Sequence, residues 1–198
     1  MRRRVFLLSL VFLLLINVNL LALDKLVLAP TADLMGGKGF ISGEIIGSSR
    51  RQVSGLYNIS SSLALGGTIH FNRHNTEPGI LAKLIIVQED EVQPAVAIGL
   101  QKEDLYIVAS KNLGLGFRGH FGFGNGELGG LFIGFNKFLN PVSINSGTGS
   151  SLPIINLKGE YKNSEVSFAV QMNLQENMKV DIGFVGLEEI KLGLGYLF

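Results

Sequence analysis

Three short motifs have the residue types of ligand-binding sites. Gly114–Gly119 reads G-L-G-F-R-G and matches G-x-G-x-x-G, whose glycines admit a pyrophosphate at the start of a helix. No helical pattern follows it, so we expect no nucleotide there. His70 and His74 have the spacing of two metal ligands on a helix, but their segment has the pattern of an extended chain, which keeps the rings apart. The acidic run Glu89–Glu91 is more typical of a solvated turn than of a calcium site. The sequence therefore predicts no cofactor and no metal ion.

Charged side chains recur at every second position in several segments, a spacing that places them on one face of an extended chain. The members are Glu44 with Ser42, His70, Arg118 and His120, Lys158 and Glu160, Lys179 and Asp181, and Lys191. Such groups either pair with one another, which compensates buried charge, or line a polar path in which they and water replace the hydration of a small solute or a sugar chain. Both interpretations require elements that turn these side chains inward.

The elements that the sequence predicts are strands. After residue 25 no window has the period of an amphipathic helix, and none stays apolar for the ~18 residues that a transmembrane helix requires. Alternating segments are instead separated by turn residues such as Asn125-Gly126. The twelve candidate strands are Lys38–Gly47, Gln52–Ile59, Leu63–Phe71, Gly79–Gln88, Pro94–Gln101, Leu105–Leu113, Leu115–Gly124, Leu128–Phe138, Ile154–Tyr161, Val166–Leu174, Met178–Gly186 and Ile190–Phe198.

The faces of these strands differ in polarity. Met178, Val180, Ile182 and Phe184 alternate with Lys179, Asp181 and Gly183. Strands of about nine to eleven residues with this period and short turns are the pattern of a transmembrane barrel, in which the apolar face meets lipid and the polar face meets the lumen. A soluble sandwich also alternates, but its strands are nearer to about five or six residues. We therefore predict an all-β fold, a single antiparallel transmembrane β-barrel of about twelve strands.

The last strand adds a second indication of a barrel. Its apolar positions fall in one phase and end on an aromatic residue: Ile190, Leu192, Leu194, Tyr196 and Phe198. This arrangement resembles the C-terminal recognition signal of outer-membrane proteins that are inserted by the barrel-assembly machinery. The 26 glycines fit the same fold, because we expect many of them at lumen positions, where they leave room for long charged neighbours. These are Gly66, Gly116, Gly122, Gly124, Gly183, Gly193 and Gly195.

The N-terminal segment has the features of a secretory signal peptide. Three arginines precede an apolar run that extends to Leu23. We place the signal peptide at 1–22 and one barrel domain at 23–198; an uncleaved membrane anchor is the alternative. Without residues 1–22 the 17 basic residues fall by three, to 14, against 16 acidic residues. With this balance we expect no nucleic-acid partner, and the absence of cysteine excludes thiolate chemistry.

Several short blocks, in order, resemble the YjbH-like family of outer-membrane proteins associated with exopolysaccharide. The blocks are 29–32 with Gly39, 94–100, 106–111, 115–124 leading into 129–134, and 157–161. The resemblance extends over nearly the whole chain after the signal peptide, through short blocks in the same order, and this chain is shorter than the usual member. The resemblance implies an outer-membrane barrel with a role in handling polysaccharide.

The three histidines do not match two kinds of enzymatic barrel. A lipid-cleaving barrel has a histidine two residues before its serine, and a proteolytic barrel has an aspartate two residues before its histidine. The residues at those offsets are Asn72, Thr76 and Gly122 after the histidines, and Thr68, Asn72 and Arg118 before them. We therefore expect no enzyme, although a triad is defined by geometry and not by sequence position.

Taken together, these patterns predict an outer-membrane protein with a structural or transport role, with exopolysaccharide export or envelope biogenesis as candidate processes. Its expected partners are the lipid bilayer, the barrel-assembly machinery during insertion, and polysaccharide or a small polar solute. A small passive channel for polar solutes and a secreted soluble all-β binding module are the alternatives.

Overall fold

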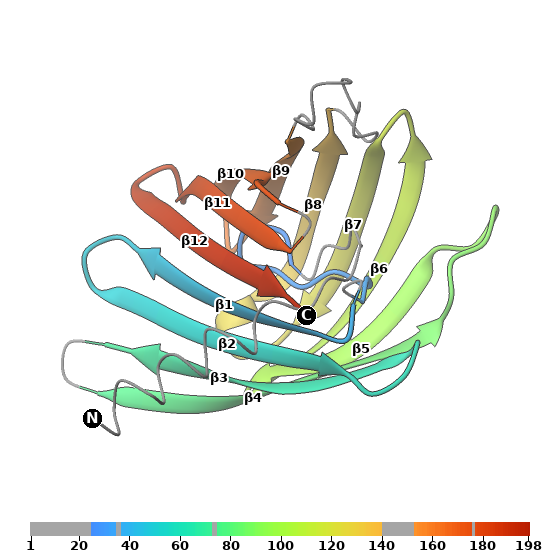
Figure 1. The fold of residues 1–198 in the computed structure, drawn as a ribbon. Coiled ribbons are helices and arrows are strands. Elements are labelled where there is room, and N and C mark those ends of the chain that lie inside the picture. The colour runs from blue at the N-terminus through green and yellow to red at the C-terminus, as the bar shows by residue number, and fades with distance from the viewer. Residues whose placement is uncertain (1–24, 35–36, 73–74, 140–152, 176) are drawn as a thin grey trace.

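The computed structural model describes residues 25–34, 37–72, 75–139, 153–175 and 177–198, so the predicted signal peptide lies outside the described residues. The described chain forms a closed antiparallel barrel of twelve strands, each paired with the next, with β12 paired to β1 (Figure 1). The strands are β1 (Gly39–Ile46), β2 (Arg50–Asn58), β3 (Leu63–Phe71), β4 (Thr76–Val87), β5 (Ala95–Lys102), β6 (Asp104–Gly114), β7 (Phe117–Gly124), β8 (Gly130–Phe138), β9 (Ile154–Lys162), β10 (Glu165–Asn173), β11 (Met178–Val185) and β12 (Glu189–Leu197), and a short 3₁₀ helix, η1 (Gly126–Leu128), precedes β8. The predicted fold class and strand number are confirmed.

Closure depends on the pairing of the first and last strands. The register runs from Phe40 opposite Leu197 to Ile46 opposite Lys191, which leaves neither strand with an open edge. The carbonyl of Phe198 then accepts hydrogen bonds from the N–H groups of Lys38 and Gly39, both at 2.8 Å. We call the end where β1 begins and β12 finishes the terminal end of the barrel, and the opposite end the far end.

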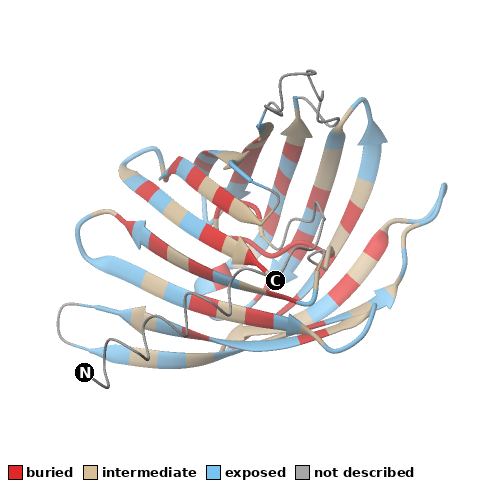
Figure 2. Ribbon diagram, viewed as in Figure 1, coloured by how far each residue is buried: buried red, intermediate tan, exposed pale blue. Residues whose placement is uncertain are grey.

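Buried and exposed residues alternate along most strands of the barrel, as the banding in Figure 2 shows. On β12, Ile190, Leu192 and Leu194 are 55%, 48% and 54% exposed, while Lys191 between them is fully buried. The outward phenylalanines behave likewise: Phe117, Phe121, Phe123, Phe135 and Phe184 are all exposed. The outer surface is thus apolar and the inner surface carries the charged side chains, which is the reverse of a soluble sandwich.

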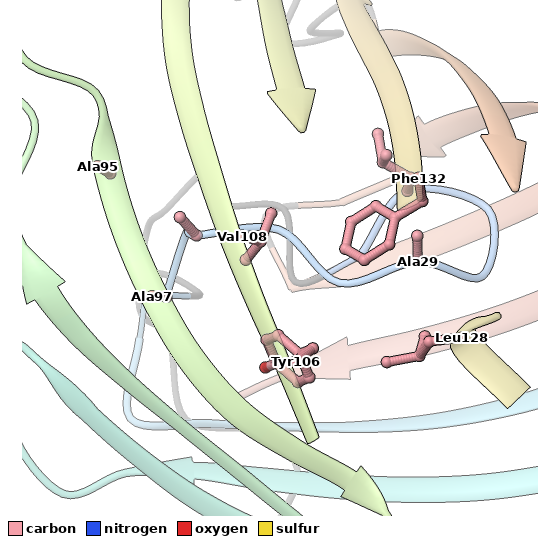
Figure 3. Packing of buried hydrophobic residues seen from close by; sticks show 9 residues of the cluster. Ala29, Ala95, Ala97, Tyr106, Val108, Leu128 and Phe132 are labelled. Carbon is pink, nitrogen blue, oxygen red and sulfur yellow. The ribbon is translucent and has the colours of Figure 1, made fainter. Parts of the chain in front are cut away.

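Residues 25–34, which we call the inner segment, lie inside the barrel. The segment turns on itself, with the Leu26 N–H donating to the Ala29 carbonyl at 2.9 Å. Leu26 and Ala29 belong to one buried apolar cluster with the inward side chains of Val108 and Phe132, and Figure 3 shows Ala29, Val108 and Phe132 within it. On another side Val27 packs with Ile46, Ala169 and Val185. The segment therefore forms the apolar core of the barrel together with a few inward wall residues.

Two turns show how local chemistry sets the connections. Asn163 and Ser164, between β9 and β10, have φ of 53° and 65°, the pattern of a two-residue type I′ hairpin whose twist suits the flanking strands. Leu115 and Gly116 have φ of 52° and 77° and form the turn between β6 and β7. The prediction that Gly116 is a lumen position within a strand is therefore wrong. Among the described residues, no helical segment is long and apolar enough to cross a bilayer.

Candidate functional site

The residues predicted for the lumen lie on inward positions of the strands. Seven of the nine are buried, and His70 and Arg118 are half-buried; the buried ones are Glu44, His120, Lys158, Glu160, Lys179, Asp181 and Lys191. Most of these side chains contact the inner segment or one another. The site is therefore best described by the groups that hold this segment.

The carboxylate of Glu160 on β9 is bound by the backbone of the inner segment. Its Oε2 accepts hydrogen bonds from three successive N–H groups, those of Val27 at 3.0 Å, Leu28 at 2.8 Å and Ala29 at 2.8 Å. Successive N–H groups that converge in this way form an anion-binding nest. Because the donors are backbone groups, no sequence motif at residues 27–29 could have announced this contact.

Alternating charges surround the same part of the lumen. The fully buried ammonium of Lys191 donates to the Val27 carbonyl at 2.6 Å and lies 3.6 Å from Glu44 and 3.8 Å from Asp181. Lys158 pairs with Asp181 at 2.7 Å, and Lys25 of the inner segment pairs with Glu44 at 2.8 Å. The buried charges thus compensate one another, which is the ion-pair interpretation of the sequence pattern.

A second cluster holds the inner segment nearer the terminal end. Arg118 on β7 donates from Nε and Nη2 to the two carboxylate oxygens of Asp33, at 2.9 and 2.5 Å, and from Nη1 to Glu89 at 2.6 Å. Lys83 on β4 donates to the Asp33 carbonyl at 2.8 Å. Of this cluster only Arg118 was predicted for the lumen. Asp33 lies outside any alternating run, so only the tertiary fold could reveal its role.

A chain of polar side chains crosses four neighbouring strands. Ser110 Oγ lies 2.8 Å from His120 Nδ1, and His120 Nε2 lies 2.7 Å from Asn136 Oδ1, while Asn136 donates to Asn156 at 3.3 Å. The serine, histidine and asparagine are the residue types of a hydrolase triad, brought together here by the fold and not by a sequence motif. Ser110, however, is 1% exposed and its Oγ accepts the Ala32 N–H at 2.9 Å. This row of hydrogen-bonded side chains therefore acts, through Ser110, as a third anchor for the inner segment.

Cavities lie on both sides of the inner segment. At the far end a cavity of about 360 Å³ is lined by side chains such as Arg50 and Lys102 at strand ends and Glu127 of η1. A void of about 50 Å³ lies between Lys25, Pro30 and the walls of β1 to β6, and Gln52, His70 and Gln101 line both spaces. A cavity of about 410 Å³ at the terminal end contains Asp33, Glu89 and Arg118 in its lining. The inner segment thus separates two cavities, with a water-sized polar space beside it.

The described residues offer no cluster of three or more histidine or acidic side chains that could hold a metal ion. What the site offers instead is polar: hydroxyl, amide and charged groups directed at the inner segment and at the spaces around it. Such groups can bind and orient a small polar or charged solute.

Comparison with known proteins gives the fold. No family model matches the chain, and no curated protein matches it. Among solved structures the chain is similar to a "KdgM porin", with a TM-score of 0.54 and 12% sequence identity, over 81% of this chain and 99% of the porin. A "KdgM porin in complex with disordered oligogalacturonate" matches over the same shares at 11% identity, with the same TM-score. The chain therefore shares the closed-barrel fold of these porins.

Proposed function

We propose that this protein is an outer-membrane channel for small polar solutes, narrowed by its own inner segment. The observation that carries the proposal is the combination of an apolar outer face with a lumen that has a cavity on each side of the segment, each with charged side chains in its lining. Exposed apolar side chains occur on all twelve strands. A soluble monomer rarely exposes contiguous apolar surface around its whole circumference, whereas a bilayer covers such a surface and closure satisfies the backbone. The porin-like fold and the secretory pattern of the N-terminus support the same location.

The dimensions of the lumen determine what such a channel passes. The space beside the inner segment, about 50 Å³, admits water and small ions. Its lining combines apolar side chains with serine, threonine, amide, lysine and histidine groups, and these polar groups can replace part of a solute's hydration. A larger solute passes only when the inner segment moves.

Planar-bilayer recording tests this proposal directly. Protein that is extracted in detergent and retains the heat-dependent gel mobility of a folded barrel is added to the bilayer, with heat-denatured protein as the control. We expect small, discrete conductance steps from the folded sample and none from the denatured one. A folded sample that produces no steps at any voltage contradicts a channel function. Recovery of the protein in a detergent-free wash of the membranes contradicts the location.

A role in exopolysaccharide handling is the second candidate. It is supported by the ordered blocks that resemble the YjbH-like family, and by the neighbouring porin whose complex contains an oligogalacturonate. Under this proposal a deletion strain shows altered surface polysaccharide, and a plasmid copy restores it. Unchanged polysaccharide in the deletion strain counts against it.

The C-terminal residues are part of the proposal as an insertion signal. Ile190, Leu192 and Leu194 face outward, and Phe198 closes the strand register beside Gly39. We expect recognition by the barrel-assembly machinery to depend on Phe198, so that Phe198→Ser lowers the folded fraction in cells. If Phe198→Ser impairs recognition alone, the purified variant still refolds in detergent. If it lowers the stability of the barrel, refolding in detergent is lost as well.

A further inference from the structure

Arg118 is built to bind a carboxylate. Its Nε and Nη2 edge makes two parallel hydrogen bonds to Asp33, while Nη1 is held by Glu89. A guanidinium fork of this kind matches both oxygens of a carboxylate, which gives geometric selectivity as well as charge attraction. Because Glu89 fixes the third nitrogen, the edge stays oriented whichever carboxylate occupies it.

The carboxylate now in place belongs to a segment that is not part of the barrel wall. Asp33 lies near the C-terminal end of the inner segment, inside the lumen. The pair borders the cavity of about 410 Å³ at the terminal end, which is within the size range of small-molecule sites. The side chains of Arg118 and Asp33 are 18% and 17% exposed, so a solute in that cavity can reach the ion pair.

We propose that Arg118 is the recognition residue for carboxylate-bearing solutes, such as acidic sugars, and that Asp33 is an internal carboxylate which such a solute displaces. This inference rests on the proposed function and names the class of solute for the same lumen. Displacement removes one of the anchors of the inner segment. The terminal half of the segment is then held by the Lys83 contact to the Asp33 carbonyl and the Ser110 contact to the Ala32 N–H, so this half is the one that loosens.

The other half of the segment keeps its own contacts. Glu160 continues to bind the N–H groups of residues 27–29, and Lys191 the Val27 carbonyl. Solute binding and widening of the lumen are therefore coupled through one short segment that remains attached at its other end. A neutral sugar has no group that exchanges with Asp33 and leaves the segment in place.

Competition between the two carboxylates predicts the effect of removing the internal one. Asp33→Asn leaves Arg118 and Glu89 unchanged but removes the charged competitor. If Asp33 occupies the guanidinium for at least about nine-tenths of the time, the variant binds a solute carboxylate at least about tenfold more tightly. Arg118→Gln removes the fork, and Arg118→Lys keeps the charge without it.

The test is titration calorimetry on the folded, detergent-solubilised protein with glucuronate, using glucose as the neutral probe. We expect weak glucuronate binding by the wild type, at least tenfold tighter binding by Asp33→Asn, and loss of binding in Arg118→Gln and Arg118→Lys. Lys38→Gln removes an exposed cation at the terminal end that is not part of the cavity lining, and it binds as the wild type does. Heat-dependent gel mobility verifies that each variant is folded.

Three results overturn the proposal: Asp33→Asn binds no more tightly than the wild type, folded Arg118→Gln or Arg118→Lys binds as the wild type does, or glucose binds as well as glucuronate. Calorimetry does not require conductance, so the two proposals fail separately. A conducting protein whose Asp33→Asn variant shows no gain refutes only the solute assignment. A non-conducting protein that binds glucuronate through Arg118 refutes only the channel.

Discussion

Glu160 accepts three of the hydrogen bonds that position the inner segment. A buried carboxylate is costly unless it accepts hydrogen bonds, and here three backbone N–H groups bind one of its two oxygens, Oε2. The alternation of Lys158 and Glu160 predicted an inward carboxylate, but its partners could not be predicted, because backbone donors carry no sequence signature. The sequence therefore predicts that the Glu160 carboxylate points inward, and only the fold shows which groups it binds.

Replacing Glu160 by glutamine should destabilise the folded barrel. Glu160→Gln weakens three charge-assisted hydrogen bonds and leaves buried N–H groups poorly satisfied, so we expect a loss of about 1–3 kcal/mol in the free energy of unfolding. Urea unfolding in detergent, followed by gel mobility, measures it. Glu165→Gln, at the exposed start of β10, is the matched control and should change the free energy little. An equal effect of the two substitutions would show that the nest contributes nothing.

Lumen glycines make a second prediction at the scale of single residues. A Cβ at Gly195 would lie 2.5 Å from the ring of Phe40, whereas a Cβ at Gly43, which faces outward on the adjacent strand, meets no atom within 4 Å. We therefore expect Gly195→Leu to reduce the yield of folded barrel severely and Gly43→Leu to be tolerated. Gel mobility of the two variants after parallel refolding measures the difference. Equal yields would contradict the assignment of β12 to its inward phase.

At the scale of elements, the two-residue period was sufficient to predict the strands. All twelve predicted segments overlap strands of the barrel, because each strand pairs with its neighbour in sequence and needs only a short turn. The inner segment was not predicted, since residues 25–34 neither alternate nor form a helix. Their position follows from contacts with Glu44, Ser110, Arg118 and Glu160, which lie far away in sequence.

The loop between β4 and β5 should loosen in acid. Asp90 accepts hydrogen bonds from the N–H groups of Gln93 and Val92, which lower the pKa of its carboxyl. At Glu89 partial burial opposes ionisation, but the N–H of Asn112 and the Arg118 guanidinium lower the pKa overall. Because the pKa is lower in the folded state than in the unfolded state, these contacts stabilise the loop at pH values above the unfolded pKa of about 4. The stabilisation is lost as the pH falls below that value, through the lowered pKa.

Amide exchange tests this pH dependence within one sample. We expect the protection of the Gln93 amide to fall between about pH 5 and pH 3 relative to that of Leu63. The Leu63 N–H is bound by the hydroxyl of Ser60 at 3.1 Å in a turn at the same end of the barrel, and a hydroxyl does not titrate in this range. Asp90→Asn keeps an acceptor oxygen but should abolish the pH dependence. A parallel loss of protection at Gln93 and Leu63 would instead indicate general unfolding.

At the scale of the whole molecule, the barrel combines a rigid wall with a core that the N-terminal part of the chain supplies. Each strand is hydrogen-bonded on both sides, so the wall opens only by global unfolding. The inner segment is held by side-chain contacts that can exchange one at a time, at Glu160, Ser110 and Arg118. Any change in the width of the lumen should therefore occur in the segment while the wall stays intact.

A disulfide between the inner segment and the barrel wall tests whether the segment moves while the wall stays rigid. The chain has no cysteine of its own, so an introduced pair can form only this disulfide. Ala32 N and Ser110 Oγ are 2.9 Å apart, so oxidised Ala32→Cys/Ser110→Cys should fix the segment and suppress the larger conductance states. Reduction should restore them. The control is Val53→Cys/Ile69→Cys, a cross-strand pair on the outer face that links two strands without contacting the segment and should conduct alike in both redox states. Both disulfides stiffen the barrel, but only Ala32→Cys/Ser110→Cys restrains the segment. If the oxidised and reduced forms of that variant carry equal currents, the segment does not set the width of the lumen.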